Sequence, residues 1–333
     1  MKLLVTGGAG FIGSCFILGM LQKHQDWTIA CLDKLTYAGN LDNLSSLKGS
    51  KRFSFHLADI ASEEDVARVF EETKPEVVVN FAAESHVDRS ISEPGLFVRT
   101  NVKGAAVLLE AALQHGVQRF HQVSTDEVYG ELPLDRPELL FYEDSILKPS
   151  SPYSASKAAA DLLALSYHRT YGLPVTITRS SNNYRPRQFP EKLIPLMVIK
   201  ALKGEKLPIY GDGLNVRDWM HVEDNVSAIE TVLLKGQPGE IYNAGARNEK
   251  NNLEITGQIL SLLGMSDELI THTADRKGHD RRYAVATGKL ESLGWKCEVS
   301  FQSGLQSTVD WYLSHRQWWQ DILSGAYRRR KEL

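Results

Sequence analysis

The chain is poor in cysteine, balanced in charge and without long apolar runs. Its 333 residues include only three cysteines, Cys15, Cys31 and Cys297, which are far apart and lack the close spacing of metal ligands. We therefore expect neither a disulfide framework nor a metal site, and a cytoplasmic location. Thr6 and Gly7 interrupt the apolar start of the chain too early for a signal peptide. No stretch has the length of a membrane-spanning helix, so no membrane contact is expected.

Neither sign of charge dominates. Lysine and arginine number 38 against 41 aspartate and glutamate residues, a formal net charge of −3. Nothing global suggests affinity for nucleic acid, so no nucleic-acid partner is expected. The basic run at 328–331 is interpreted as a solvated terminus. What the chain does have is 42% hydrophobic residues, enough for one large or two fused globular domains.

The first half of the chain alternates short apolar segments with helical periods. This βαβ rhythm predicts an α/β fold with a doubly wound (Rossmann) parallel sheet. After residue 180 the rhythm breaks, and prolines, glycines and charges cluster between helical periods. We predict a Rossmann domain over 1–180, with a late return near 216–244, and a smaller interleaved α/β substrate domain over 181–333. The expected strands lie at 3–5, 28–32, 53–57, 77–82, 117–123 and 175–178, and the expected helices at 11–23, 63–72, 102–115, 153–171, 193–202, 225–234, 253–263 and 306–313.

A glycine-rich loop follows the first strand and opens the first helix. Gly7, Gly10 and Gly13 form the pattern G-x-x-G-x-x-G, in which missing side chains let backbone N–H groups approach a pyrophosphate. Asp33 closes the second strand, 20 residues after Gly13, where an acidic residue binds the adenine-ribose hydroxyls. Because its charge would repel a 2′-phosphate, NAD is predicted rather than NADP, although the adjacent Lys34 weakens this distinction.

A second group of polar residues follows the apolar strand at 117–123. Ligands of parallel sheets bind at the carboxyl ends of strands, and Tyr153 and Lys157 stand at i, i+4 on one face of the next helix. A free tyrosine has a pKa near ~10, but a lysine ammonium and a positive nicotinamide would lower it, so that Tyr153 could take an alcohol proton as hydride leaves for NAD. Adjacent carboxyls can be held in opposite protonation states by their environment. The predicted catalytic residues are Thr125, Asp126, Glu127, Tyr153 and Lys157.

The loop at 7–14 together with the segment at 153–157 resembles the extended short-chain dehydrogenase/reductase superfamily. Within it, the segments at 33–41, 82–90, 124–130, 189–195 and 278–283 resemble the dTDP-glucose 4,6-dehydratases. The resemblance implies a retained NAD and conversion of dTDP-glucose to dTDP-4-keto-6-deoxyglucose, by C4 oxidation, loss of water across C5–C6 and hydride return to C6. It further implies that Tyr153 takes the proton of the C4 hydroxyl, which Thr125 holds. Glu127 would remove the C5 proton and Asp126 would protonate the departing C6 hydroxyl.

The cofactor contacts combine position and resemblance. Asp59 and Ile60 follow the strand at 53–57 and are placed near the adenine, although a polar strand end is nearly as good an interpretation. The full predicted cofactor set is Gly7, Gly10, Phe11, Ile12, Gly13, Asp33, Lys34, Leu35, Thr36, Asp59, Ile60, Ala82, Ala83, Ser85, Thr100, Tyr153, Lys157 and Asn183.

The implied partner is a nucleotide-diphosphate sugar. An arginine such as Arg217 could present its guanidinium to phosphate oxygens, and Tyr210 could stack on the base. In the family these segments line the substrate cleft. The residues carried over as substrate contacts are Ser85, Thr125, Asn182, Lys192, Leu193, Pro208, Ile209, Tyr210, Arg217, Asn252, Arg276 and His279.

The chain departs from the family pattern at a few positions. Arg185 replaces a usual glycine, Lys277 replaces a usual proline, and Arg187 adds a charge beside the first of these. These are either surface changes or changes that reshape the cleft. In the second case UDP-glucose or UDP-N-acetylglucosamine would undergo the same chemistry.

Three other interpretations remain open. A nucleotide-sugar 4-epimerase or a decarboxylase would share the NAD site and the Tyr153/Lys157 pair but would not need Asp126 and Glu127. A non-catalytic NAD-binding regulator would need none of these residues. By resemblance to the superfamily we also expect a homodimer, paired through the helices at 102–115 and 153–171.

Overall fold

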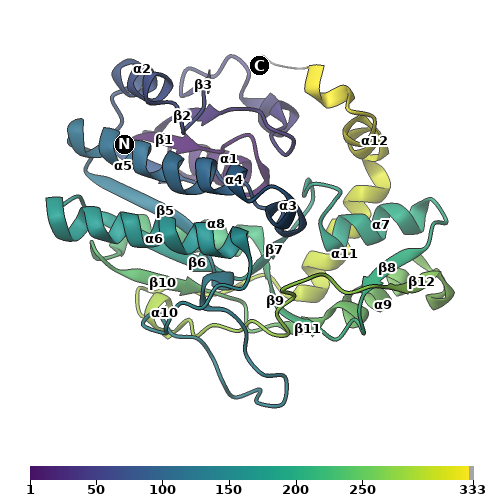
Figure 1. Cartoon of the computed structure of the whole chain (residues 1–333). Helices are drawn as coiled ribbons and strands as arrows, with labels where there is room; N and C mark the ends of the chain where they lie inside the picture. The colour runs from purple at the N-terminus through teal and green to yellow at the C-terminus, as the bar shows by residue number, and fades with distance from the viewer. Residues whose placement is uncertain (330–333) are drawn as a thin grey trace.

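A computed structural model describes residues 1–329, so Arg330 and Lys331 of the basic C-terminal run lie outside the described residues. The chain forms two lobes, a large sheet covered by helices and a smaller lobe of short strands and helices (Figure 1). No helix within residues 1–329 is long and apolar enough to cross a bilayer.

The large lobe is built on a seven-stranded parallel sheet. Neighbouring strands pair in parallel register, with Val5 opposite Cys31 on one side and Val79 on the other. These central strands are buried on both faces, as their continuous apolar sequence requires. Across the sheet, the strands are β10 (Ile241–Ala244), β6 (Val175–Ser180), β5 (Arg119–Thr125), β4 (Val77–Asn80), β1 (Lys2–Thr6), β2 (Thr28–Asp33) and β3 (Phe53–Leu57).

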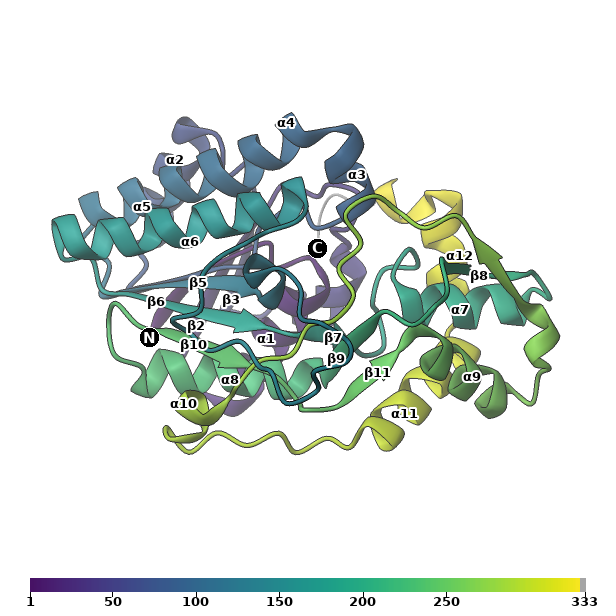
Figure 2. The same ribbon diagram turned by 60° about the horizontal axis from the view of Figure 1, so that its bottom comes forward.

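Helices cover both faces of this sheet. On one face α1 (Phe11–Lys23) packs beside α8 (Val222–Lys235), and their side chains share a buried core with β1, β2 and β4. On the other face lie α2 (Glu63–Thr73), α5 (Gly104–Gln114) and α6 (Pro152–Tyr171), and α5 and α6 run side by side (Figures 1 and 2). The predicted doubly wound α/β class is therefore confirmed.

The second lobe has its own core. Tyr184, Met197, Ile259 and Tyr312 are almost fully buried in it, and each such side chain contributes about 1.5–3 kcal/mol through burial. Its elements are β7 (Asn182–Tyr184), β9 (Val216–His221) and β11 (Glu249–Asn251) in one sheet, β8 (Leu207–Tyr210) paired with β12 (Ile270–Thr273), and the helices α7 (Leu193–Leu202), α9 (Asn252–Leu263), α11 (Phe301–Ser314), α12 (Arg316–Ser324) and η5 (Ala326–Arg329).

Short helical turns complete the fold. One of them differs from expectation: the helix expected over 102–115 begins as a π-helical turn, η2 (Val98–Lys103), before α5. In this turn Thr100 lines the cavity described below, and the buried Asn101 bonds to the backbone of Glu84 and to Ser156. The other short elements are η1 (Leu41–Leu47), α3 (Val87–Ser92), α4 (Pro94–Phe97), η3 (Asp126–Tyr129), η4 (Asp267–Leu269) and α10 (Gly288–Glu291).

The chain after residue 180 crosses between the lobes. Of the return expected near 216–244, β10 joins the edge of the large sheet and α8 covers its face, whereas β9 pairs with β7 and β11 in the second lobe. The division into domains at 180 stays a prediction.

Candidate active site

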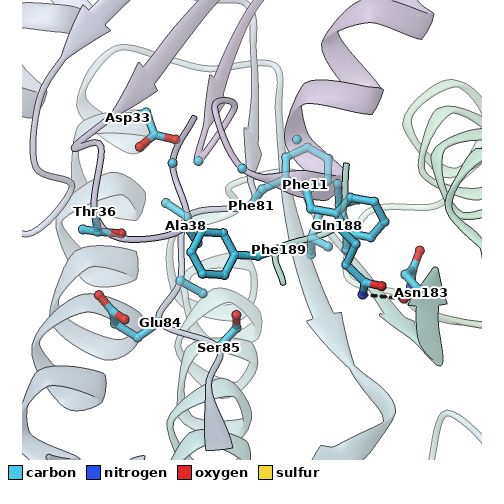
Figure 3. A pocket seen from close by; sticks show the side chains of 18 of the residues that line it. Phe11, Asp33, Thr36, Ala38, Phe81, Glu84, Ser85, Asn183, Gln188 and Phe189 are labelled. Carbon is cyan, nitrogen blue, oxygen red and sulfur yellow. Dashed lines mark hydrogen bonds between the residues drawn. The ribbon is translucent and has the colours of Figure 1, made fainter. Parts of the chain in front are cut away.

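A large cavity lies at the carboxyl ends of the parallel strands, and both lobes contribute to its wall (Figure 3). All five predicted catalytic residues line it. So do the predicted cofactor residues, with the exception of Leu35, whose N–H donates to Asp33 at 2.8 Å. The catalytic and cofactor residues, which are spread over 177 positions of the chain from Gly7 to Asn183, therefore meet in one place.

The glycine loop forms a cradle that side chains would fill. Gly7 has φ +67°, and a Cβ added there would lie 2.6 Å from the backbone nitrogen of Ala82. A Cβ on Gly13 would lie 2.5 Å from the Gly7 carbonyl oxygen. Gly10 is the N-cap of α1 and makes no side-chain cap, so the first N–H groups of the helix can face an anion. The loop therefore fits the pyrophosphate of a dinucleotide.

Asp33 is oriented at the end of β2 by backbone donors. Its carboxylate accepts the N–H of Ala9 at 3.0 Å and that of Leu35 at 2.8 Å. Burial raises the pKa of Asp33, and these two hydrogen bonds oppose that shift. Lys34 places its Nζ 2.7 Å from Asp59. The lysine that weakened the distinction between NAD and NADP is thus paired with a carboxylate.

The turn after β5 presents the two carboxyls. The Thr125 hydroxyl accepts the N–H of Glu127 at 3.3 Å, which caps η3, and donates to Asp126 Oδ1 at 3.3 Å. Lys157, on α6, is buried and donates from Nζ to the carbonyl of Val123 at 2.6 Å. Burial lowers the pKa of Lys157 to about 8.

Tyr153 lies beside this turn. In the protein without ligands, its phenol has a raised pKa and stays protonated. Burial and the carboxyls of Glu127 and Asp126 raise the pKa of Tyr153, and a hydrogen bond with Thr125 opposes the shift. The lowering expected from Lys157 is not found in the protein alone: the Nζ of Lys157 is bonded to the backbone of β5, and burial and the two carboxyls have the largest effects on the pKa of Tyr153. A phenolate here depends on the positive charge of a bound nicotinamide.

Asp126 and Glu127 lie in different electrostatic surroundings. Asp126 is 1% exposed, and its Oδ2 has no hydrogen-bond partner among residues 1–329. Burial, then Glu127 and Asp218, raise its pKa well above the usual value. Burial also raises the pKa of Glu127, but Arg217, Arg276 and Lys192 all oppose that shift. Burial thus raises the pKa of both carboxyls, and three cations oppose the shift at Glu127, whereas Arg217 and a hydrogen bond with Thr125 oppose it at Asp126. Unequal surroundings of this kind can divide two carboxyls into one acid and one base.

The predicted substrate residues divide into two groups. Ser85, Thr125, Asn182 and Lys192 line the cavity, and Lys192 donates to the carbonyl of Ser85 at 3.1 Å. The remaining eight do not belong to the cavity wall, namely Leu193, Pro208, Ile209, Tyr210, Arg217, Asn252, Arg276 and His279.

Arg217 is buried and bonded to backbone carbonyls outside the cavity wall. It is 6% exposed and donates to the carbonyls of Val216 at 2.7 Å and Asp280 at 2.9 Å. Its guanidinium lies 4.2 Å from the ring centre of Tyr283. In this position its charge acts on Glu127, and two of its donors are already used within the protein.

Three of the other residues gather with Asp88, a residue that we did not predict. The Tyr210 hydroxyl donates to Asp88 at 3.3 Å, and Arg276 Nη1 lies 3.9 Å from the same carboxylate. His279 meets the Tyr210 ring edge-on at 6.1 Å. Burial and Arg276 lower the pKa of His279 to about 4, so it is neutral at pH 7. This cluster links the second lobe to α3 of the first.

Several cavity residues were missed by sequence reasoning. The Tyr37 hydroxyl donates to Glu191 at 2.9 Å, and the Tyr37 ring meets the Phe189 ring edge-on, with 5.4 Å between the ring centres. Phe189 is one of the cavity-lining side chains labelled in Figure 3. These three lie in the segments 33–41 and 189–195, so the resemblance contained a signal for them. Trp318 and Ile322 carried none, because the short helix α12 was not predicted.

The departures from the family pattern fall in different places. Arg185 lies outside the cavity wall, with Nη1 2.8 Å from Cys15 Sγ and Nη2 3.4 Å from Glu223. Lys277 is exposed and also outside the wall. For Arg185 and Lys277 the geometry therefore favours the first of the two interpretations, in which the departures do not reshape the cleft. Arg187, in contrast, lines the cavity.

Comparison with known proteins agrees with this geometry. The model of the family described as GDP-mannose 4,6 dehydratase matches residues 4–308. The dTDP-glucose 4,6-dehydratase of Salmonella typhimurium is 48% identical, over 98% of this chain and 97% of the relative. A similar structure is the crystal structure of DesIV, the dTDP-glucose 4,6-dehydratase of Streptomyces venezuelae, with NAD bound. The two chains are 48% identical in sequence with a TM-score of 0.93, and the match covers 97% of this chain and 100% of DesIV. An NAD complex of the dTDP-glucose 4,6-dehydratase of Bacillus anthracis has 49% identity and a TM-score of 0.90, over 97% and 99% of the two chains.

Proposed function

The chain belongs to the GDP-mannose 4,6 dehydratase family, and from this membership and the site we infer that it is an NAD-dependent dTDP-glucose 4,6-dehydratase, a hydro-lyase. The observation that carries this inference is the carboxyl pair Asp126 and Glu127, which lies beside Thr125 and Tyr153 in the dinucleotide cavity. Dehydration needs both an acid and a base next to the oxidising centre. Epimerisation needs only the tyrosine that serves C4 oxidation and not this additional acid and base, and cofactor sensing needs none of these groups.

The cavity provides for the cofactor at its deep end. NAD, when bound, accepts hydride from sugar C4 and returns it to C6 in the same turnover. The backbone of the glycine loop would hold the pyrophosphate, and Asp33 would bind the adenine-ribose hydroxyls. Residues of both lobes line the cavity, which supports retention of the cofactor between turnovers.

The protein's own groups supply the proton transfers. We assign Tyr153 Oη as the acceptor of the C4 hydroxyl proton, with Thr125 Oγ1 positioning that oxygen. The resulting C4 ketone acidifies the C5 proton, which the Glu127 carboxylate removes. Asp126 gives its proton to the C6 hydroxyl, which leaves as water, and Glu127 later returns its proton to C5. The proton left on Tyr153 balances the one lost from Asp126, so the enzyme is restored after exchange with water.

We further propose a cytoplasmic homodimer. All three cysteines are free thiols, which supports a reducing compartment. The outer side of the α5/α6 face carries exposed apolar side chains, including Val98 at 56%, Leu162 at 58% and Tyr171 at 57% exposure. A second copy of the chain would cover them.

Mass spectrometry after incubation with dTDP-glucose, UDP-glucose and UDP-N-acetylglucosamine, without added reductant, tests the function. We expect loss of one water from dTDP-glucose in preference to the other two. A changed sugar configuration at unchanged mass would instead identify an epimerase. No reaction with any of the three, with NAD still bound, would favour a regulator.

A further inference from the structure

Arg187 is a strained arginine in the wall of the cavity. Its φ is +69°, in the left-handed region that favours glycine, and its side chain is half-buried. Non-glycine residues held in this region concentrate at functional sites, where surrounding contacts maintain the strain. The observation therefore raises the question of what the Arg187 guanidinium does in the cavity.

Its hydrogen bonds place the guanidinium at one end of the cavity. Arg187 Nη1 donates to the carbonyl of Asn43 at 3.4 Å, and Asn43 Nδ2 donates to the carbonyl of Ala9 at 3.2 Å. Ala9 belongs to the glycine loop, and the neighbouring Gly10 and Phe11 line the same cavity. Its charge also acts on Cys15, within α1. Arg187 thus lies beside the start of α1.

No carboxylate within residues 1–329 pairs with the charge of Arg187. The adjacent Arg185 pairs with Glu223, but Arg187 forms no ion pair in the part of the chain that the structure describes. Burial and the Arg185 charge lower the pKa of Arg187. A half-desolvated cation of this kind is stabilised by an anion from outside the chain.

We propose that Arg187 binds the cofactor pyrophosphate from the side opposite the backbone N–H groups of α1. The remaining guanidinium N–H groups would form charge-assisted hydrogen bonds to the phosphate oxygens. The proposal rests on the proposed NAD dependence and adds a side-chain contact to the backbone cradle. Arg187 is one of the charges by which this chain departs from the family pattern, and the proposal gives it a role in retaining the cofactor.

The experiment measures the binding of NAD, ADP-ribose and adenosine to cofactor-free protein by calorimetry at two salt concentrations. The decisive variant is Arg187→Gly, because glycine accepts the left-handed backbone and removes only the side chain. We expect its affinity for NAD and ADP-ribose to fall by about tenfold or more, with adenosine binding unchanged. The salt dependence of NAD binding should fall as well. Arg187→Lys should restore part of the affinity.

Arg185→Ala is the matched control, since it removes a neighbouring positive charge that lies outside the cavity wall. An equal loss of NAD affinity in Arg185→Ala and Arg187→Gly would overturn the proposal, because the loss would then come from the lower net positive charge and not from a contact of Arg187. Unchanged NAD affinity in Arg187→Gly would also overturn it, while leaving NAD dependence intact. Failure of the parent protein to bind NAD would instead contradict the proposed function.

Discussion

At the scale of single residues, neighbours in the chain receive different chemistry from their surroundings. Asp126 is buried, and its Oδ2 has no hydrogen-bond partner in the part of the chain that the structure describes, whereas the charges of three cations from other parts of the chain act on Glu127. The free-energy cost of ionising a buried carboxyl is large unless charges or donors compensate it. Three cations act on Glu127, whereas Arg217 and the Thr125 hydroxyl act on Asp126, and this difference supports the proposed roles of base for Glu127 and acid for Asp126.

Glu127→Gln should stop the reaction after the first oxidation. The amide cannot accept the C5 proton, so water loss should fall by about 10²–10⁴-fold while reduced cofactor accumulates on the enzyme. Stopped-flow absorbance with dTDP-glucose measures the reduced cofactor, and mass spectrometry measures the dehydrated product. Full turnover by this variant would remove Glu127 from its assigned role.

Asp126→Asn should give a different defect from Glu127→Gln. It removes the acid but leaves the base, so the C5 proton should still exchange with deuterium from the solvent although water loss is slow. Glu127→Gln should block that exchange. NMR of the recovered sugar distinguishes the two. Exchange in Glu127→Gln but not in Asp126→Asn would mean that the two assignments must be reversed.

The raised pKa of Asp126 also predicts a stability effect. Because the folded state holds this proton more tightly than the unfolded chain, its contribution to stability is full below the unfolded pKa and declines as pH rises towards the folded pKa. The decline is at most about 1.4 kcal/mol per pH unit. The melting temperature of Asp126→Asn should therefore increase relative to that of the parent protein as the pH rises from 4 to 8.

The exposed Asp26→Asn serves as the control for this series, and it should show no such trend. A constant melting difference between Asp126→Asn and the parent across the pH range would mean that Asp126 is already ionised in the folded protein.

At the scale of elements, the C-terminal helices reach back over the cofactor end of the cavity. Trp318 and Ile322 of α12 line the cavity, and the Tyr327 hydroxyl of η5 donates to the carbonyl of Tyr37 in the loop after β2. Phe189 lies against both Tyr37 and Tyr327. A contact between the two ends of the chain therefore helps to hold the loop that encloses the cofactor.

Tyr327→Phe should speed the release of NAD. Loss of one hydrogen bond of about 1 kcal/mol corresponds to a release rate about fivefold faster. Displacement of bound NAD by an excess of a fluorescent analogue measures the rate. Tyr171→Phe is the control, since Tyr171 is 57% exposed on α6 and far from the cavity wall. Equal release rates for Tyr327→Phe and the parent would show that this contact does not restrain the loop.

At the scale of the whole molecule, the two faces of the large sheet differ in what covers them. The α1/α8 face continues into the second lobe, where Glu298 and Val299 donate to Asp224 of α8. The α5/α6 face carries the exposed apolar side chains of Val98, Leu162 and Tyr171. These exposed side chains support the proposed self-association through α5 and α6.

Leu162→Glu should therefore convert the proposed dimer to a monomer. A buried, unpaired charge at the centre of an apolar interface costs several kcal/mol. Light scattering coupled to size exclusion measures the mass. The matched control is Leu234→Glu on α8, where Leu234 is 51% exposed on the opposite face. A monomeric parent protein, or a dimer that survives Leu162→Glu, would contradict the proposed interface.

Local patterns in the sequence were sufficient for the α/β class and for most of the large lobe. The helix 11–23 and the strand 53–57 were predicted with their observed bounds, because glycine and polar residues end the apolar runs there. The short strands β8, β11 and β12, of three or four residues each, were not predicted. They are too short to show a period, and their pairing partners lie far away in the chain.

The sequence by itself determined the reactive groups and the cofactor loop, because Gly7–Gly13, Thr125–Glu127 and Tyr153–Lys157 are contiguous segments whose spacing has a local physical meaning. Only the tertiary structure decided the charge on each group. Arg217 is bonded to the carbonyl of Asp280 and its charge acts on Glu127, and Arg187 rather than Arg185 lines the cavity. Burial and electrostatic potential depend on side chains brought together from distant positions, and no local pattern records those distances.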